Sequence, residues 1–357
     1  MGIQEEIEKI EEELKKTKYN KATQGHIGKQ KAKLAKLRSD STKSSGKKGA
    51  GYSVKKSGDA TVILVGFPSV GKSSLLNKLT NAQSKVGAYD FTTLDVIPGT
   101  LIYNSTIIQV LDVPGLITEA SAGKGRGREI LAVIRNADFL IIVAAAKTEE
   151  GIIRQVDLIN QELYNAGFRL NTHMPDVRIY KKNFGGLTVD STVKLTKISI
   201  EEVRSVLNEF GIYNADVLIR ENVTTDELID AVLKNRVYIP SVIVVNKIDL
   251  FKPKKLPFEY LEVSAINENN IDKLKELIWE KLDVIRVYLK KIGKDPDMNE
   301  PLIFRKHATV EDVCKKIHQK FLDNFKYAKI WGSGKFPGQK MGLEYTLKDK
   351  DIVELHF

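Results

Sequence analysis

The sequence predicts an α/β protein whose central element is a doubly wound, mostly parallel β-sheet. Apolar runs such as TVILVGF (61–67) and FLIIVAAA (139–146) have the length of buried strands and are far too short to span a membrane. From residue 60 to about 150 such strands alternate with helical segments, which is the pattern of βαβ units. The same pattern resumes only at SVIVVNKIDL (241–250), so residues 150–238 are predicted to be an insertion within one domain.

The other segments are predicted to form smaller parts around this sheet. Apolar residues at helical spacing through 3–39, interrupted by TKYNKATQG, indicate two helices joined by a turn, followed by the linker DSTKSSGKKGAG (40–51). The last helix of the central domain is expected at 270–285. The predicted parts are a basic helix-turn-helix segment with its linker (1–57), a central domain in two pieces (58–149 and 239–298), an inserted α+β domain (150–238) and a C-terminal α+β module (299–357).

The basic character of the chain is concentrated near its N-terminus. The formal net charge is +10, yet residues 15–57 alone carry fourteen Lys and Arg against one acidic residue, Asp40. Such a segment favours phosphate backbones as partners, and a solvated arm without a partner is the alternative. Only Tyr19 and Tyr52 are aromatic in it, which favours contacts with phosphates and RNA shape over base stacking.

Cysteine usage and the first residues bear on the compartment. Cys314 is the only cysteine, which excludes an intramolecular disulfide framework and a cysteine-based zinc site. The opening stretch MGIQEEIEKIEEEL is acidic and has no apolar signal segment. We therefore expect a cytoplasmic protein with no membrane segment.

A phosphate-binding loop is predicted directly after the first strand of the central domain. The stretch GFPSVGKS (66–73) fits G-x-x-x-x-G-K-[ST], follows the apolar TVILV and precedes the helical SLLNKLT. In that context backbone N–H groups and a helix N-terminus face phosphates. The residues predicted to bind nucleotide here are Gly66, Phe67, Pro68, Ser69, Val70, Gly71, Lys72, Ser73 and Ser74.

Two further motifs select guanine. NKID (246–249) follows the strand SVIVV, and the carboxylate of Asp249 can accept hydrogen bonds from guanine N1–H and N2–H, which adenine lacks. Asn246 is expected at the N7 side, with the stem of Lys247 over the base. EVSA (262–265) ends another apolar strand, so the backbone N–H groups of Ser264 and Ala265 can reach guanine O6. Three motifs in this order, each at the carboxyl end of a predicted strand, indicate a guanine-nucleotide site.

Two loops are predicted to sense the γ-phosphate. Asp112, in DVPG, is expected to hold Mg²⁺ through water, together with Ser73 and with Thr93 from FTT (91–93); Thr92 is the alternative to Thr93. The N–H of Gly115 is expected at the γ-phosphate. Lys72, Thr93 and Gly115 are the predicted catalytic residues, and Ser73, Thr93 and Asp112 the predicted metal ligands.

The position after Gly115 poses a chemical problem for hydrolysis. Well-known GTPases carry a water-orienting glutamine there, whereas this chain has Leu116, which can neither donate nor accept a hydrogen bond. GKGRGRE (123–129) offers Lys124, Arg126 and Arg128 as replacements, and a solvated or RNA-facing basic patch is the alternative. We expect slow hydrolysis that is stimulated by a partner or a cation.

The residues that carry a family resemblance run through the whole chain. The chain resembles the Obg-related GTPases in four stretches, GDATVILVGFPSVGKSSLLNKLT, YDFTTLDVIPG, LDVPGLI and GKGRGRE. Three further features narrow the resemblance to the developmentally regulated GTP-binding (DRG) proteins, of archaeal type. They are the stretch KATQGHIGKQKAKLAKLR, the position of the insertion, and the stretch WGSGKFPGQKMGLEYTLKDKDIVELHF.

The resemblance implies a specific architecture and activity. It implies a P-loop GTPase domain, an insertion resembling domain 2 of ribosomal protein S5, and a C-terminal β-grasp TGS domain. It implies slow Mg²⁺-dependent GTP hydrolysis, with K⁺ as a further cation, although Ser69 stands where cation-dependent relatives carry Asn. The partners implied are the ribosome or RNA, and a stabilising protein.

The sequence therefore favours a slow GTPase switch acting on ribosomes or RNA in translation. A GTP/GDP-sensing RNA-binding module with incidental hydrolysis is one alternative. An Obg-like ribosome-assembly GTPase is another, although the long glycine-rich domain with which Obg proteins begin is lacking here.

Overall fold

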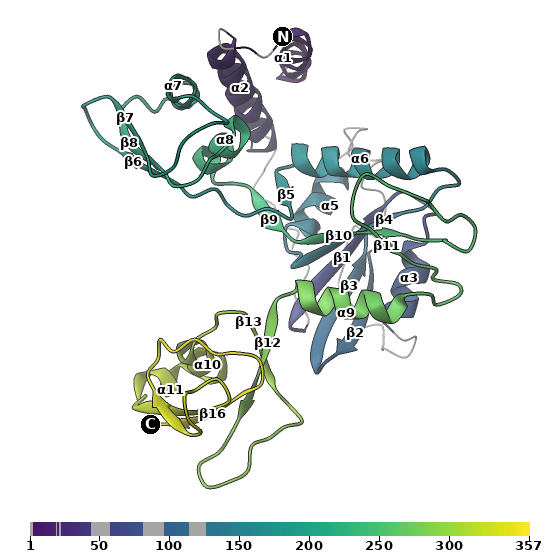
Figure 1. Ribbon diagram of the computed structural model, residues 1–357, viewed down its shortest axis with the longest axis vertical. Coiled ribbons are helices and arrows are strands. Elements are labelled where there is room, and N and C mark those ends of the chain that lie inside the picture. Colours follow the sequence, from purple (N-terminus) through teal and green to yellow (C-terminus); the bar gives the residue numbers. More distant parts are fainter. Residues whose placement is uncertain (1–2, 19, 21–22, 44–57, 81–95, 114–125) are drawn as a thin grey trace. The chain divides into compact units, whose positions relative to one another are not determined.

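The computed structural model describes residues 3–18, 20, 23–43, 58–80, 96–113 and 126–357. The chain forms two compact units. Their helices and strands are labelled in Figure 1. Met1–Gly51 and Leu163–Tyr238 form the first, here the N-terminal unit, and Tyr52–Glu162 and Ile239–Phe357 form the second, here the core unit. Within the described residues, no helix combines the length and the apolar character that a bilayer crossing requires.

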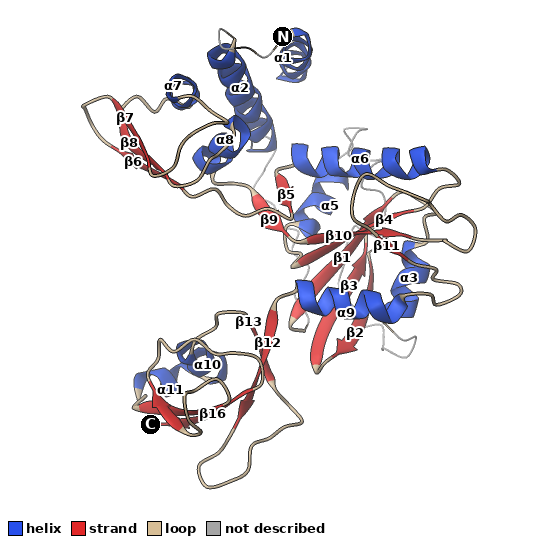
Figure 2. Cartoon of the chain, in the orientation of Figure 1, coloured by secondary structure: helices blue, strands red, loops and turns tan. Residues whose placement is uncertain are grey.

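A six-stranded sheet lies at the centre of the core unit (Figure 2), in the order β11-β10-β4-β1-β3-β2. Its strands are β1 (Ala60–Gly66), β2 (Ile97–Tyr103), β3 (Thr106–Asp112), β4 (Phe139–Ala144), β10 (Ser241–Val245) and β11 (Leu261–Glu262). Neighbouring strands are parallel except β2 and β3, which are antiparallel. Every residue of β1 is buried, as expected for a parallel strand covered on both faces.

Helices cover both faces of this sheet. They are α3 (Lys72–Leu79), α5 (Arg126–Ile134), α6 (Glu149–Asn165) and α9 (Ile271–Lys281). On one face Leu64 of β1 shares a core with Leu75 of α3 and Leu274 of α9. On the other, Ile152 of α6 packs with Ala144 of β4, and Figure 2 shows α6 and α9 on opposite sides of the sheet. The predicted doubly wound, mostly parallel sheet is confirmed.

The C-terminal part of the core unit holds a five-stranded mixed sheet, in the order β13-β12-β16-β14-β15. Its elements are β12 (Val284–Leu289), β13 (Leu302–Arg305), α10 (Val310–Ile317), α11 (Gln319–Asp323), β14 (Tyr327–Trp331), β15 (Gln339–Met341) and β16 (Asp351–His356). Strand β12 pairs antiparallel with β13 and parallel with β16. Val313 and Cys314 of α10 are fully buried in one core with Val353 of β16, which gives the expected β-grasp arrangement.

One sequence prediction about this region is wrong. The helix predicted for 270–285 ends at Lys281, and Val284–Leu289 forms strand β12 instead. The segment VIRVYL is rich in β-branched and aromatic residues, and its two ladders with β13 and β16 override the helical pattern that precedes it.

The N-terminal unit combines the two N-terminal helices with the inserted segment. Its elements are α1 (Ile3–Lys16), α2 (Gln24–Lys43), β5 (Phe168–Leu170), β6 (Val177–Lys181), β7 (Leu187–Ser191), α7 (Ile200–Glu209), β8 (Ala215–Ile219), α8 (Thr225–Leu233) and β9 (Val237–Ile239). Strands β6, β8 and β7 form a three-stranded sheet, and β5 pairs with β9. Ser199 caps α7, and Thr224 with Glu227 forms a capping box at α8, which fixes where both helices begin.

Helix α2 is built into the core of the inserted segment. Ala32 of α2 is fully buried in the same core as Val203 and Val206 of α7. Gly28 allows the close approach, because a Cβ there would lie 2.9 Å from Cγ of the buried Glu202. The four domain limits drawn from the sequence stay predictions, because packing units need not coincide with functional domains.

Candidate nucleotide-binding site

The phosphate-loop sequence forms a tight turn between β1 and α3. Gly71 adopts φ 92°, and a Cβ at this residue would lie 2.5 Å from Nδ2 of Asn246. A Cβ at Gly66 would lie 2.3 Å from the carbonyl oxygen of Val143. Both positions therefore require glycine. Among the described residues no side chain caps the N-terminus of α3, so the first N–H groups of the helix stay available to an anion.

Lys72 lies at the centre of this loop. Its side chain is buried, and Nζ donates to the carbonyl oxygens of Gly66 and Phe67 at 3.0 Å each. Burial of the ammonium lowers the pKa of Lys72, and the charge of Asp112 opposes that shift. No carboxylate of the described residues contacts this buried cation, so the cation gains stabilisation when a phosphate binds.

Ser73 and Asp112 are brought together from α3 and β3. Ser73 Oγ donates to Asp112 Oδ2 at 2.5 Å, and Asp112 is 5% exposed. Its other oxygen, Oδ1, is buried and has no hydrogen-bond partner within the described part of the chain. A hydroxyl and a carboxylate with an unsatisfied buried oxygen fit a hard cation such as Mg²⁺ or a water that the cation holds.

The predicted guanine residues are assembled beside the same loop. Asn246 is buried; its Nδ2 donates to the Val70 carbonyl at 2.9 Å and its Oδ1 accepts from the N–H of Ala265 at 3.1 Å. Ser264 Oγ donates to Asp249 Oδ1 at 2.5 Å, while Asp249 itself is exposed. The side chain of Asn246 thus joins the phosphate loop to the loop predicted to hold guanine O6.

Lys247 makes a second connection between these loops. It adopts φ 63°, and its Nζ donates to the carbonyl of Ser69 at 2.7 Å. The other predicted loop residues, Pro68 and Ser74, are exposed, and neither side chain forms a hydrogen bond with the residues that the structure describes. The sequence predicts base contacts for Asn246 and Lys247 but gives no sign of their hydrogen bonds to the phosphate loop, because these bonds join residues about 180 positions apart.

Several predicted residues lie outside the described part of the chain. They are Thr92, Thr93, Gly115, Leu116 and Lys124. Arg126 and Arg128 begin helix α5, and only their backbone is described. The roles predicted for these residues stay predictions.

A salt bridge between Lys78 of α3 and Glu268 was not predicted. The two side chains meet at 2.5 Å, and the hydrogen bond from Lys78 lowers the pKa of Glu268. Glu268 follows Ser264 and Ala265 in the loop before α9, so the pair fixes that loop against the phosphate-loop helix. No sequence signal joins these residues, which are 190 positions apart.

We expect Lys78→Met and Glu268→Gln each to raise the Kd for GDP by less than about fivefold, because ion pairs between exposed side chains contribute little. Without the ion pair, the loop that carries Ser264 and Ala265 should be less ordered. The dissociation rate of GDP should therefore change more than its association rate. Stopped-flow release of a fluorescent GDP analogue measures this. Lys275→Met, which removes an ion pair with Asp272 on α9, is the matched control. Equal effects from the control would contradict the role given to the pair.

The family models match the chain along most of its length. A "50S ribosome-binding GTPase" model matches residues 61–174, the "C-terminal region of MMR_HSR1 domain" matches 184–284, and the "TGS domain" matches 285–356. A GTP-binding protein of Methanocaldococcus jannaschii is 53% identical over 367 residues, which covers 99% of this chain and 93% of that protein. Developmentally-regulated GTP-binding protein 2 of Homo sapiens is 43% identical over 364 residues, covering 99% of each chain.

The chain belongs to the DRG family of GTP-binding proteins. It carries the P-loop GTPase domain and the C-terminal TGS domain that the sequence predicts. A further DRG relative, a GTP-binding protein of Halobacterium salinarum, is 44% identical over 99% of both chains. The G domain of the T. maritima FeoB iron transporter covers 62% of this chain at 19% identity, but its TM-score of 0.32 is too low to bear on the fold.

Proposed function

We propose that this DRG protein hydrolyses GTP to GDP and phosphate in a slow, Mg²⁺-dependent reaction, and that it acts as a switch on ribosomes or RNA in translation. The observation that carries the proposal is the convergence of Lys72, the Ser73–Asp112 pair and Asn246 with Asp249 around one phosphate loop. Membership of a GTP-binding family with a GTPase domain supports it.

In this proposal the residues act by binding and orienting GTP. Lys72 exchanges the carbonyl oxygens of Gly66 and Phe67 for oxygens of the β- and γ-phosphates. Its buried positive charge then stabilises the negative charge on these oxygens while the γ-phosphoryl group is transferred to water. Asp249 accepts the two guanine N–H groups, and Asn246 keeps the guanine loop in register with the phosphate loop. Hydrolysis then depends on positioning more than on covalent chemistry.

Ser73 and Asp112 are proposed to hold Mg²⁺, with Thr93 closing over it when GTP is bound. The metal would screen the charge of the phosphate oxygens. The buried Oδ1 of Asp112 is the site's own indication that a positive charge or an ordered water belongs there.

The attacking water is the reactant of the proposed reaction that has the fewest candidate residues to orient it. The side chain of Leu116 offers it no hydrogen bond, so the backbone N–H of Gly115 and Thr93 are the proposed means of placing it. We propose that a partner, or K⁺ beside Ser69, supplies the missing stabilisation; Lys124, Arg126 and Arg128 are the alternatives within the chain. An arginine acting in this way contributes about 10³–10⁵ in rate.

The experiment that tests this proposal is multiple-turnover GTP hydrolysis in K⁺ and in Na⁺ buffers, with and without ribosomes. We expect a slow Mg²⁺-dependent rate that rises with K⁺ or with ribosomes. Tight GTP binding with no turnover under any of these conditions would support the second candidate function, a GTP/GDP sensor, for which Leu116 is the specific observation.

RNA is the proposed partner of the basic N-terminal segment and the TGS domain. Much of the positive charge on α2 is already paired: Lys31 with Asp226, Lys33 with Glu6, and Arg38 with Glu11, at 2.7–2.8 Å. Glu6 raises the pKa of Lys33. We therefore assign the phosphate contacts chiefly to lysines 47, 48, 55 and 56, which follow α2 in the sequence and lie outside the described residues.

Replacing these four lysines by glutamine is expected to weaken RNA binding and to lower the slope of log affinity against log salt by up to about 3, since each phosphate contact on a single strand contributes about 0.7. Filter binding over a salt series measures this. The matched variant with four arginines should keep the wild-type slope. An unchanged slope in the glutamine variant would remove the segment from the RNA interface. Deleting residues 1–57 is a poorer test, because it removes Ala32 and Ile27 from buried positions.

A further inference from the structure

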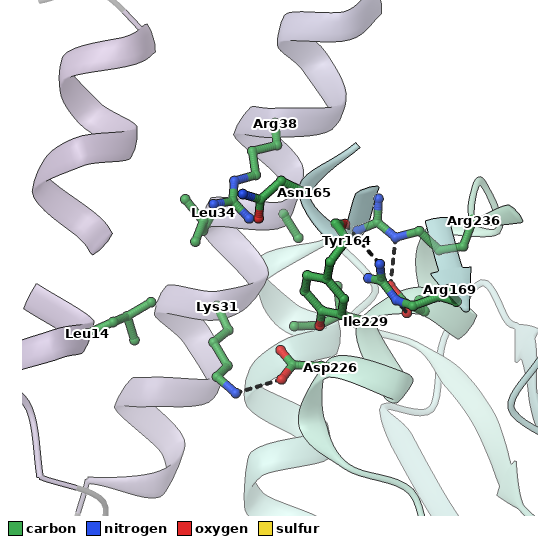
Figure 3. A pocket seen from close by; sticks show the side chains of 12 residues that line it. Leu14, Lys31, Leu34, Arg38, Tyr164, Asn165, Arg169, Asp226, Ile229 and Arg236 are labelled. Atoms are coloured by element: carbon green, nitrogen blue, oxygen red, sulfur yellow. Dashed lines mark hydrogen bonds and ion pairs between the residues drawn. The ribbon is translucent and has the colours of Figure 1, made fainter. Parts of the chain in front are cut away.

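The N-terminal unit contains a cavity that takes no part in the nucleotide site. It measures about 240 Å³, and all residues that line it belong to this unit. In Figure 3, Lys31 and Arg38 line it from α2, and Asp226 from α8. Tyr164 and Asn165, at the end of α6, and the arginines Arg169 and Arg236 also line it, with Leu34 and Ile229 providing apolar wall.

A buried cluster of three charges lies at this cavity. Asp230 accepts from Nε and Nη2 of Arg169, at 2.5 and 2.8 Å, and from Nε of Arg236, at 2.6 Å. The side chains of Asp230, Arg169 and Arg236 are 4%, 10% and 12% exposed. Two guanidinium groups share one carboxylate, so the three side chains together carry one excess positive charge in a largely buried place. Such a charge is unfavourable unless a counter-charge binds it.

The two arginines differ in how many donors they have left. Arg169 uses most of its donors: besides its bonds to Asp230, its Nη1 donates to the carbonyls of Tyr164 and Phe168, and its guanidinium lies 3.8 Å from the centre of the Tyr164 ring. Arg236 uses only Nε. Its Nη1 and Nη2 have no hydrogen-bond partner among the residues that the structure describes. Arg236 therefore presents a free pair of amino groups at the cavity.

The other polar groups at the cavity favour an anion as the occupant. Four cationic side chains line it against two carboxylates, and one of the four, Arg38, is paired with Glu11. Lys31 is held by Asp226 at 2.8 Å, and both are partly exposed, so their charges can readjust. The amide of Asn165 adds neutral donors. Several converging N–H donors match the oxygens of a phosphate better than the two oxygens of a carboxylate.

We propose that this cavity is a phosphate-binding site, in which Nη1 and Nη2 of Arg236 hold the phosphate and neutralise the Arg169–Asp230–Arg236 cluster. Its volume is below the roughly 300–1,000 Å³ typical of pockets for whole organic ligands. It therefore suits a phosphate group with little else attached. The phosphate is either a free anion or part of an RNA backbone, and the site stands apart from the proposed GTPase reaction.

The proposal is tested on the full chain, labelled with ¹⁵N-arginine and saturated with GDP and Mg²⁺ so that the nucleotide site is occupied. Inorganic phosphate is titrated at constant ionic strength while the Nε signals of Arg236 and Arg169 are followed. We expect both signals to shift and to saturate, with chloride at equal ionic strength giving no such shift. Absence of a saturable shift up to about 20 mM phosphate, and with an RNA oligonucleotide as well, would overturn the proposal.

Three variants make the test specific. Arg236→Gln should weaken phosphate binding at least tenfold, followed through Arg169. Arg236→Lys keeps the charge but loses the paired amino groups, so it should bind more weakly than wild type while its fold is retained. Arg220→Gln, which removes an exposed arginine of the same unit that lies near Asp176, should stay within twofold. Unchanged binding in Arg236→Gln, or an equal loss in Arg220→Gln, contradicts the assignment.

The source of the phosphate is decided by competition. If a single-stranded RNA shifts the same two arginine signals and inorganic phosphate displaces it, the occupant is a backbone phosphate, and the cavity extends the RNA interface. If only inorganic phosphate shifts them, the occupant is a free anion. Both results support a phosphate site, and neither depends on whether GTP is hydrolysed.

Discussion

Replacing Asp249 by asparagine is expected to lower the affinity for GTP and GDP by about 10²–10⁴-fold. The carboxylate is proposed to accept two guanine N–H groups, and hydrogen bonds to a charged partner contribute about 1.5–3 kcal/mol each. An asparagine amide presents a donor where guanine also donates. Xanthine carries a carbonyl in place of the guanine N2 amino group, so the variant should gain affinity for XTP as it loses GTP.

Equilibrium binding of both nucleotides to the variant measures this exchange. Asp249 is exposed, so the fold should be retained, although the hydrogen bond from Ser264 changes. Asp272→Asn is the matched control, because this carboxylate is almost fully exposed on α9. A variant that binds GTP as wild type does, or loses both nucleotides equally, would show that Asp249 does not read the base.

Replacing Lys72 by methionine is expected to separate nucleotide binding from stability. Affinity for GTP and GDP should fall by at least about 10²-fold, because a buried cation facing phosphates is lost. The free energy of unfolding of the nucleotide-free protein should change by no more than about 1 kcal/mol. Methionine fills a similar volume, and no carboxylate of the described residues contacts the buried ammonium that it replaces.

The free energy of unfolding of wild type and of Lys72→Met should depend differently on pH. Because burial lowers the pKa of Lys72 in the folded state, the unfolded chain binds this proton more tightly. Between the lowered pKa and the ordinary value of 10.5, Lys72 makes the free energy of unfolding rise with pH. Below that window Lys72 is protonated in both states, so the whole cost of burying its charge is subtracted from the free energy of unfolding. Lys72→Met should lose this rise. Chemical denaturation of wild type and variant between about pH 7 and 10.5 measures it; identical pH profiles would contradict the burial of a charged Lys72.

The parts of the fold and site that were predictable are those written in contiguous stretches. GFPSVGKS and NKID each pair a local backbone geometry with its chemistry, so Lys72 and Asn246 could be placed at the ends of buried strands. The alternation of strands and helices gave the doubly wound sheet for the same reason. The end of α9 was missed because VIRVYL continues an apolar pattern, and its strand identity comes from partners far along the chain.

The features that sequence reasoning missed depend on long-range contacts. The packing of Gly28 against Glu202 and the bonds from Asn246 and Lys247 to the phosphate loop join residues well over a hundred positions apart. The Arg169–Asp230–Arg236 cluster likewise joins strand β5 to helix α8. A single sequence shows the residue types in each case but not their pairing.

The central claim is that this site hydrolyses GTP with the help of Mg²⁺, and single-turnover hydrolysis tests it most directly. The protein is held in excess over labelled GTP or ATP, with Mg²⁺ or with EDTA, and Lys72→Met serves as the inactive control. We predict GDP and phosphate formation from GTP alone, dependent on Mg²⁺ and lost in the variant. Hydrolysis that is equal for ATP, indifferent to EDTA or undiminished in Lys72→Met would contradict the account.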